Sequence, residues 1–457
     1  MNKFIETFKN IWSIKELRDK ILFTVIILVV YRFGTHVLLP GVNADALATA
    51  ADNRGATDLL NLINTFSGGA FNQGSIFALG IMPYITASII IQLLGFAVPY
   101  FQKLQQKEGE SGRKKLNQYT RFLTVAITLV QGSAYLALLA NQNAIDPTVS
   151  KPVFFLGNSI ILSAGSIFAM WLGEKITDRG IGNGISLLIM IGIIATLPRS
   201  FVAEVQGQIK SSSLILILEL VLWFFVILAA ILVIQGVRRI PIQFANRMVG
   251  RSSADVPMSG ARDYIPLKVN ASGVMPIIFA QAIMFLPLTL AQWSMNSSGG
   301  QGSDFLISMQ NWQSLPYNII FFLLVVVFTY IYTALIVNPK QYADHLKRQN
   351  SFIPGIKPGD DTEEYIDSLT TRVTLPGSIF LGLLAILPAI VAGFGVSQGF
   401  AIFFGGTSLL ILVGVVLDTL QQIESYLLMK KYDGLIKAGK IKGRSEGGTG
   451  MQIGASI

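Results

Sequence analysis

The chain alternates long apolar runs with shorter polar segments. A helix rises 1.5 Å per residue, so about 20 apolar residues match the ~30 Å hydrocarbon core of a bilayer. Ten runs are close to this length. They predict ten membrane-spanning helices, at residues 21–39, 75–97, 119–140, 153–173, 182–198, 214–235, 271–293, 316–338, 375–393 and 400–421.

The second run differs from an ordinary lipid-facing span. Its residues 75–94 include no Lys, Arg, Asp or Glu, yet they hold Gly80, Pro83 and Gln92. Directly upstream, residues 59–66 are apolar but too few to cross, and glycines follow them. Broken helices are tolerated at membrane depth only where they line a cavity. The two segments therefore predict a half-span, a glycine hinge and a full span beside a pore or a binding site.

The distribution of basic residues predicts the orientation of the chain. With a cytoplasmic N-terminus, 30 of the 35 Lys and Arg residues fall in cytoplasmic segments and 4 fall in outer loops. Cytoplasmic loops carry such an excess, so both termini are expected inside. The first twenty residues are amphipathic and basic, and we interpret them as a segment on the cytoplasmic membrane surface rather than a cleavable signal peptide.

Ten spans divide into two sets of five, and an odd number forces the two sets into opposite orientations. We therefore predict an all-α membrane protein with two inverted five-helix halves around a central pore, with a re-entrant helix. Two cytoplasmic loops are long enough to predict partner docking. The predicted segments are the N-terminal segment 1–20, the first half 21–198, an outer hinge loop 199–213, the second half 214–421 with docking loops 236–268 and 338–374, and a basic tail 422–457.

Composition narrows the chemistry. The chain is 52% hydrophobic and 13% charged, against about 25% charged residues in a soluble protein. It has no cysteine and two histidines, so thiol catalysis and Cys/His metal sites are excluded, and no cofactor is expected. The glycine-rich Arg179 to Ser186 superficially resembles a dinucleotide fingerprint, but it lies between two spans and is interpreted as a tight turn.

Two further patterns bear on function. The ionisable residues inside spans, Arg32, Glu219 and Asp418, lie near span ends, where the side chain reaches the interface, which counts against an ion-coupled carrier. A secondary transporter for a small solute and an intramembrane enzyme are the two alternatives to a channel. Isoleucines recur at i and i+4 on the second and fifth spans, a pattern that any lipid-facing helix can also show.

The chain resembles the SecY family, the channel subunits of the bacterial Sec protein translocase. Residues 75–94 match that family's signature nearly position for position. Further matches extend over almost the whole chain: FSGGA at 66–70, KEGESGRKK at 107–115, QYTR at 118–121, MWLGEKITDRGIGNGIS at 170–186, PLKVN and SGVMP within 266–276, YTALIVNPK at 332–340, PGIKPGD at 354–360 and FGGTSLL at 404–410.

The resemblance implies an hourglass-shaped channel that moves unfolded preproteins across the cytoplasmic membrane and releases hydrophobic helices sideways into lipid. It is not an enzyme, so a motor ATPase or the ribosome must drive it. A ring of apolar side chains forms the constriction, which excludes ions without binding a passing chain. The resemblance assigns this ring to Ile81, Ile85, Ile185, Ile189, Ile278 and Ile411.

The resemblance also implies a plug and a lateral gate. The plug maps to about residues 57–69, and its assigned residues are Asn61, Asn64, Phe66, Gly68 and Gly69. The gate lies between the second and third spans on one side and the seventh and eighth on the other, and its polar residues map to Thr86, Gln92 and Asn270.

The long cytoplasmic loops correspond to the family's docking site for the ribosome and the SecA motor ATPase. Arg251 and Lys357 are the assigned docking residues. Lys357 stands where the family usually has an arginine, so it keeps the charge but loses the bidentate geometry. The resemblance implies SecE and SecG as small membrane subunits, and SecDF and YidC as further candidate partners. Its implied cargo is signal sequences and nascent polypeptides. Its implied location is the lipid of the bacterial inner membrane.

Overall fold

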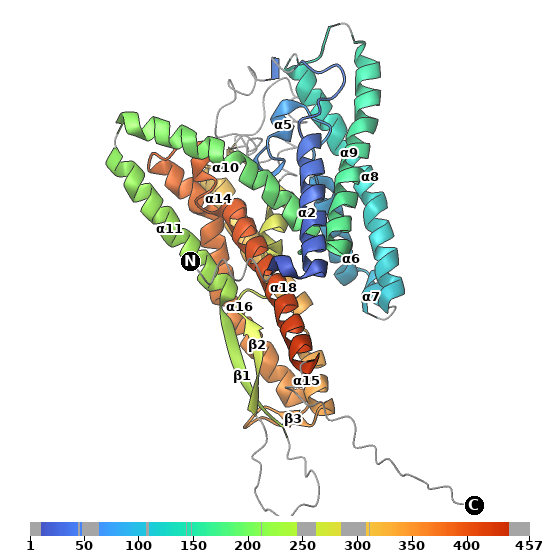
Figure 1. Ribbon diagram of the computed structural model, residues 1–457, viewed down its shortest axis with the longest axis vertical. Helices are drawn as coiled ribbons and strands as arrows, with labels where there is room; N and C mark the ends of the chain where they lie inside the picture. The colour runs from blue at the N-terminus through green and yellow to red at the C-terminus, as the bar shows by residue number, and fades with distance from the viewer. Residues whose placement is uncertain are drawn as a thin grey trace, which may run out of the picture.

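The protein is described by a computed structural model. It describes residues 11–43, 46–47, 64–106, 109–142, 144–147, 149–211, 213–244, 262–284, 308–309 and 311–437. In this part of the chain the architecture is almost entirely helical, with a small sheet at one end of the molecule (Figure 1).

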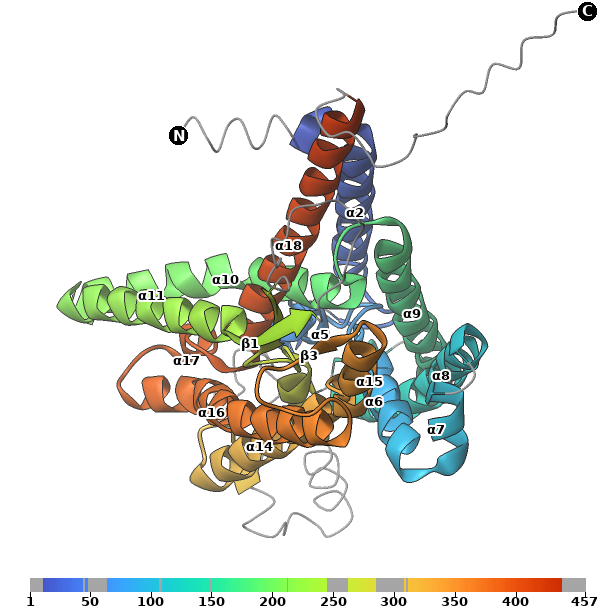
Figure 2. The same cartoon turned by 90° about the horizontal axis from the view of Figure 1, so that it is seen from below.

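The first half contains seven labelled helices: α2 (Lys15–Gly34), α5 (Ala70–Gln73), α6 (Met82–Ala97), α7 (Pro99–Gln106), α8 (Gly109–Asn141), α9 (Lys151–Arg179) and α10 (Gly184–Ser211). In this half α6 packs along α8, and α8 packs along α9. Seen along the long axis, α2, α9, α8 and α6 form a bent wall on one side of the molecule (Figure 2).

The second half begins immediately after α10. It contains α11 (Ser213–Gln235), a helix at Met275–Met284, α14 (Leu315–Ile336), α15 (Pro339–Arg348), α16 (Asp360–Gly393), α17 (Gln398–Ala401) and α18 (Gly406–Lys437). Helix α14 packs along α16, and α18 packs against α10 of the first half. The two halves therefore face each other around the centre of the molecule (Figure 2).

Hydropathy supports the membrane assignment. Among the described residues, seven helices are long and apolar enough to cross a membrane, and two shorter apolar helices lie at Met82–Gly95 and Met275–Met284. Exposed apolar side chains cover α11, which has isoleucine, leucine and phenylalanine on its outer surface. Lipid, rather than water, is the solvent that such a surface fits.

Helix α6 is shorter than the sequence predicted. The expected span began at residue 75, but residues 75–81 form turns and the helix begins at Met82. Two glycines explain the difference: Gly74 and Gly80 have φ angles of 67° and 53°, in the left-handed region that glycine tolerates. The expected full span is thus a turn region followed by a helix of 16 residues.

The predicted outer hinge loop at 199–213 is mostly helical. Helix α10 continues through this segment to Ser211, and α11 begins at Ser213. The sequence signal for a loop was the end of the apolar run, but a helix can continue beyond the hydrocarbon core where its side chains become polar. The junction between the halves is therefore a helical hairpin, seen at the upper left of Figure 1.

A three-stranded antiparallel sheet, which the sequence did not predict, joins the two long loops. Its strands are β1 (Val237–Phe244), β2 (Arg262–Lys268) and β3 (Ser351–Phe352), in the order β2-β1-β3. Alternate residues of β1, Ile240 and Ile242, are buried against α15 and the start of α16. We call this end of the molecule the sheet side.

Candidate functional site

Four isoleucines from four different helices meet at the centre of the molecule. They are Ile85 of α6, Ile189 of α10, Ile278 of the 275–284 helix and Ile411 of α18, and we call them the collar isoleucines. Together with Phe66, Met82 and Gln281 they enclose a cavity of about 10 Å³. A cavity needs roughly 10–15 Å³ to hold one water molecule. The space between the collar isoleucines is therefore closed to a column of water.

The other two predicted ring residues are placed differently. Ile185 lies one turn of α10 before Ile189 and lines a neighbouring cavity with Ile85, Ile189 and Ile278. Ile81 is 4% exposed and belongs to the same apolar core, at the N-terminal end of α6, but it lines neither cavity. The structure thus places five of the six predicted residues in the lining of these two cavities and leaves Ile81 outside it.

Wider spaces lie on both sides of the collar. The cavity on the sheet side has a volume of about 60 Å³ and is lined by polar residues such as Ser88, Gln92 and Asn183 as well as isoleucines. The cavity on the opposite side has about 280 Å³, and Arg32 and Arg199 line it with several amides and glycines. The arrangement is a narrow apolar waist between a mainly apolar cavity on the sheet side and a larger, more polar cavity on the opposite side.

The segment after residue 63 lies between the collar cavity and the larger cavity on the side opposite the sheet. Phe66 reaches the collar cavity and is 7% exposed. The chain then turns at Gly68 and Gly69, whose φ angles are 66° and 94°. Asn64 holds the turn, since its backbone oxygen accepts from the Gly69 nitrogen at 2.9 Å and its side-chain oxygen accepts from the Asn72 nitrogen at 2.9 Å. We call residues 64–69 the plug turn; Asn61 lies outside the described residues.

Two residues outside the plug turn hold it in place. Arg32 of α2 donates from Nη1 to the Gly68 carbonyl oxygen at 2.6 Å. Gly192 of α10 packs directly under the turn, so closely that a Cβ on Gly192 would come within 2.4 Å of the Phe66 oxygen. The sequence predicts Arg32 to be a span-end residue that reaches the interface. The structure instead gives it a bond to the plug turn, and no sequence signal other than an arginine inside a span pointed to it.

The predicted gate residues do not form one cluster. Gln92 of α6 accepts a hydrogen bond from the Tyr332 hydroxyl of α14, which joins the two walls of the predicted gate. Thr86 donates back to the Met82 oxygen of its own helix. Asn270 donates to the Gly273 oxygen at 3.0 Å and accepts from Ser272, so it bonds within its own turn. Of the three residues, only Gln92 bridges the seam, and Tyr332 is the partner that the sequence analysis missed.

Aromatic rings close the same seam on the α14 side. Phe279, one residue after the collar isoleucine Ile278, packs edge-on against Tyr332 with 4.7 Å between ring centres. Phe279 also lines the sheet-side cavity with Gln92. Phe279 therefore lies between the Gln92–Tyr332 hydrogen bond and the collar isoleucine Ile278.

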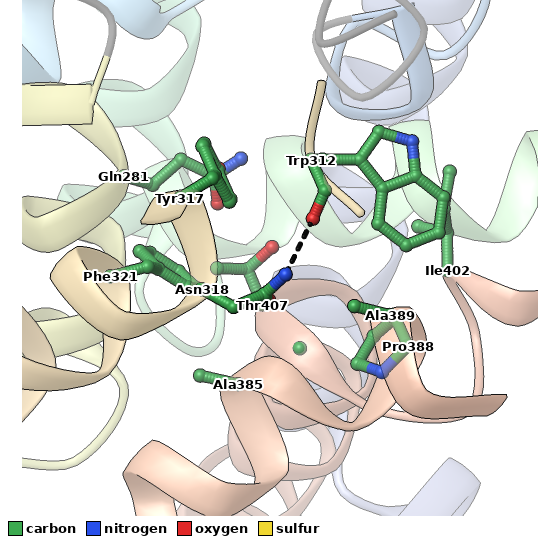
Figure 3. A pocket seen from close by; sticks show the side chains of 11 residues that line it. Gln281, Trp312, Tyr317, Asn318, Phe321, Ala385, Pro388, Ala389, Ile402 and Thr407 are labelled. Carbon is green, nitrogen blue, oxygen red and sulfur yellow. Dashed lines mark hydrogen bonds between the residues drawn. The ribbon is translucent and has the colours of Figure 1, made fainter. Parts of the chain in front are cut away.

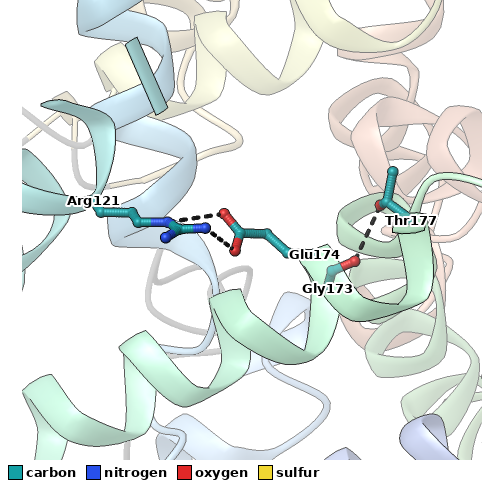
Figure 4. Close-up of polar contacts among 4 residues, drawn as sticks. All are labelled: Arg121, Gly173, Glu174 and Thr177. Atoms are coloured by element: carbon teal, nitrogen blue, oxygen red, sulfur yellow. Dashed lines mark hydrogen bonds and ion pairs between the residues drawn. The ribbon is translucent and has the colours of Figure 1, made fainter. Parts of the chain in front are cut away.

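A polar cluster on α8 and α9 fixes the turn between α9 and α10. The guanidinium of Arg121 on α8 donates two hydrogen bonds to the Glu174 carboxylate of α9, at 2.7 and 3.3 Å (Figure 4). Thr177, one turn later, donates to the Gly173 oxygen at 3.1 Å and accepts from the Gly184 nitrogen at 2.9 Å. These bonds hold the start of α10, where Ile185 and Ile189 lie. The cluster is a structural support and reaches neither chamber.

A fourth cavity lies beside the collar, between α14, α16 and α18 (Figure 3). It has a volume of about 30 Å³ and shares Gln281 with the collar cavity. Asn318 donates to the Trp312 oxygen across it at 3.0 Å. The described part of the chain contains no group of three or more His, Cys, Asp or Glu residues placed to hold a metal ion.

Of the two predicted docking residues, Lys357 is described by the structure and lies on the sheet side. Lys357 is exposed in the loop between β3 and α16, and its backbone oxygen accepts from the Thr362 hydroxyl at 2.7 Å. Its ammonium is therefore free to meet a partner from solution. Arg251 lies outside the described residues.

Comparison with known proteins agrees with this geometry. The SecY family model matches residues 75–420. The chain is 41% identical over 447 residues to "Protein translocase subunit SecY" of Streptomyces coelicolor, covering 95% of this chain and all of that one. It is 37% identical over 462 residues to "Protein translocase subunit SecY" of Chlamydia muridarum, covering 96% and 99%.

Solved structures have the same fold. "The structure of a protein conducting channel" is 20% identical, with a TM-score of 0.61 over 92% of this chain and 94% of that one. A second structure, described as "The plug domain of the SecY protein stablizes the closed state of the translocation channel and maintains a membrane seal", has a TM-score of 0.60 at 20% identity and covers 92% and 93%. The predicted fold class, a ten-helix channel with a plug, is confirmed, and the chain belongs to the SecY family.

Proposed function

We propose that the collar isoleucines are the seal of this protein-conducting channel and that the plug turn closes it from the outer side. The single observation that carries the proposal is the waist of about 10 Å³ between chambers of about 60 and 280 Å³. Branched apolar side chains around so narrow a space keep water and ions out. They also form no directional bonds, so an unfolded chain of any sequence can pass when the waist widens.

The lateral exit is proposed to open along the Gln92–Tyr332 seam. Helix α6 packs on α8 and α14 packs on α16, so each wall can move with its own neighbour. One interhelical hydrogen bond in a membrane is worth about 0.6–2 kcal/mol. Ten strongly apolar residues of a signal sequence offer on the order of 3–6 kcal/mol on entering lipid. A hydrophobic segment can therefore separate the two walls, and a polar segment cannot.

We infer a cytoplasmic position for the sheet side, in the inner membrane of a bacterium, from the excess of basic residues in the segments on that side. The ribosome and the SecA motor ATPase would then dock on the sheet, α15 and the loop of Lys357. A ribosome-bound channel, "Sec61 in the Canine ribosome-channel complex from the endoplasmic reticulum", has a TM-score of 0.58 to this chain at 18% identity. SecE and SecG are the proposed membrane subunits, and SecDF and YidC are further candidates.

Crosslinking tests the proposed path directly. The chain has no cysteine, so a single introduced thiol reports one position. We expect a stalled secretory chain that carries one cysteine to form a disulfide with Ile278→Cys. The matched control is Ile319→Cys, on the exposed face of α14, which is 50% exposed. Crosslinks to the Ile319 variant with none to the Ile278 variant would contradict the proposed path.

A further inference from the structure

Two glutamates are buried together in the α10–α11 hairpin, away from the sheet (Figure 1). Glu204 of α10 is 1% exposed and Glu219 of α11 is 4% exposed. The side-chain amide nitrogen of Gln208 donates to Oε1 of Glu204 at 3.0 Å and to Oε1 of Glu219 at 3.2 Å. One nitrogen therefore bridges both carboxyl groups, and the two groups must lie close to each other.

The other contacts of the pair are uncharged. The Ser397 backbone nitrogen donates to Oε2 of Glu204 at 3.0 Å. Oε2 of Glu219 is buried and has no hydrogen-bond partner. Across the described residues, no lysine, arginine or histidine forms an ion pair with either glutamate. Gln208 also donates to the Gly395 oxygen at 3.4 Å, so the neighbouring loop meets the pair only through backbone groups.

The described residues packed around the pair form no compensating ion pair with it. Residues 375–417, which include the 394–397 loop, α17 and most of the apolar part of α18, contain no charged residue. Glu219 is the only charged residue of α11. On α10, Arg199 lies five positions before Glu204 and lines the plug-side cavity, and Lys210 lies two positions after Gln208. Two ionised carboxylates would therefore stand side by side in a buried site without an ion-paired cation among the described residues.

Such a state is strongly unfavourable. An unpaired buried charge costs several kcal/mol, and two carboxylates that share one site cannot both ionise easily. We propose that Glu204, Gln208 and Glu219 form a proton-binding site in which the two carboxyl groups hold one proton at neutral pH. The proton comes from solvent and adds to a carboxylate oxygen to form an O–H group. Oε2 of Glu219 can accept it without losing a hydrogen bond.

The site joins two parts of the channel. The Ser397 nitrogen ties the 394–397 loop to α10, and the next residues, Gln398 and Gly399, line the plug-side cavity. Loss of the proton leaves both carboxylates negatively charged, with only the Gln208 amide nitrogen between them. Their repulsion separates α10 from α11. The loop then loses its fixed anchor. Protonation thus holds the wall of the plug-side chamber against the hairpin that connects the halves.

Infrared spectroscopy of the full-length channel in lipid nanodiscs tests the proposal. The carbonyl stretch of a protonated carboxylic acid is followed from pH 5 to pH 10, with carbon-13-labelled glutamate to identify the residue type. We expect the wild-type band to persist at pH 7 and to disappear at high pH. The band is absent from Glu219→Gln. There Glu204 is the only carboxyl group of the site, and its two hydrogen-bond donors, Gln208 and the Ser397 nitrogen, stabilise it as a carboxylate. Glu364→Gln, at an exposed position of α16, leaves the band unchanged.

Two results would overturn the proposal. One is a wild-type spectrum without a protonated glutamate at pH 7. The other is a band that appears only after a chelator removes a bound metal ion, which would make the pair a cation site. The wild-type measurement stands by itself if Glu219→Gln fails to fold. As a second readout, proteolysis of the 394–399 segment is expected to increase with pH in the wild type and to be independent of pH in a folded Glu219→Gln.

Discussion

Removing the Arg32 side-chain donor is expected to unseat the plug turn. The bond from Arg32 Nη1 to the Gly68 oxygen is 2.6 Å long and partly buried. A hydrogen bond to a charged group contributes about 1.5–3 kcal/mol. Since about 1.4 kcal/mol is a factor of ten in an equilibrium, Arg32→Met should raise the ratio of open to closed plug by about 10- to 150-fold. Methionine keeps much of the apolar stem, so the change tests the donor rather than the packing.

Ion conductance of the idle channel in planar bilayers measures this ratio. We expect a higher open probability in Arg32→Met, with no substrate present. Arg199→Met is the matched control, since Arg199 lines the same cavity and no described hydrogen bond joins it to the plug turn. The control separates loss of the bond from loss of one positive charge in the chamber. Equal leak in both variants, or no leak in Arg32→Met, would refute the role given to the bond.

Three further changes test the contacts around the waist. Gly192→Ala should open the plug, because the new methyl group would meet the Phe66 oxygen at 2.4 Å, whereas Gly207→Ala on the same helix meets nothing within 4 Å and should leave the idle conductance unchanged. Tyr332→Phe removes the hydrogen bond to Gln92 and should lower the signal-sequence hydrophobicity needed for export. An interhelical hydrogen bond of about 0.6–1.7 kcal/mol corresponds to a roughly 3- to 17-fold shift in the gate equilibrium. Identical export of a graded series of signal sequences by both proteins would count against this role. Replacing all four collar isoleucines by serine should hydrate the waist and raise ion leak, which conductance measures; an unchanged seal would contradict the role of the collar.

The membrane helices could be predicted from the sequence because a bilayer imposes one length and one composition on every span. The exceptions have local causes. Hydropathy assigned residues 75–81 to an apolar helix, but Gly74, just before the segment, and Gly80, within it, adopt left-handed conformations that hydropathy does not encode. The segment at 199–211 is polar enough to look like a loop and still continues α10. The β1–β2 pair alternates only weakly in hydrophobicity, and its strands are separated by a long segment.

The collar and the plug followed from family motifs, while the bonds that hold them followed only from the structure. Isoleucine pairs four residues apart are consistent with a lipid-facing helix as well as with a pore, and one sequence cannot separate the two. Arg32 meets Gly68 across 36 positions, and Tyr332 meets Gln92 across 240. Contacts of this range depend on how helices pack. Asn270 shows the converse, because a residue assigned to the gate by motif bonds within its own turn.

In the proposed mechanism, different interactions hold the channel closed at three levels. At the waist, apolar side chains exclude water and give no directional bond, so the seal itself costs a passing chain little. At the plug turn, one arginine and one close glycine contact fix a short segment through its backbone. At the seam, one hydrogen bond joins two walls. Each bond is worth a few kcal/mol at most, which is within the free energy that a hydrophobic signal sequence gains in lipid. A channel closed by many such bonds would not open for its substrate, and a channel closed by none would leak.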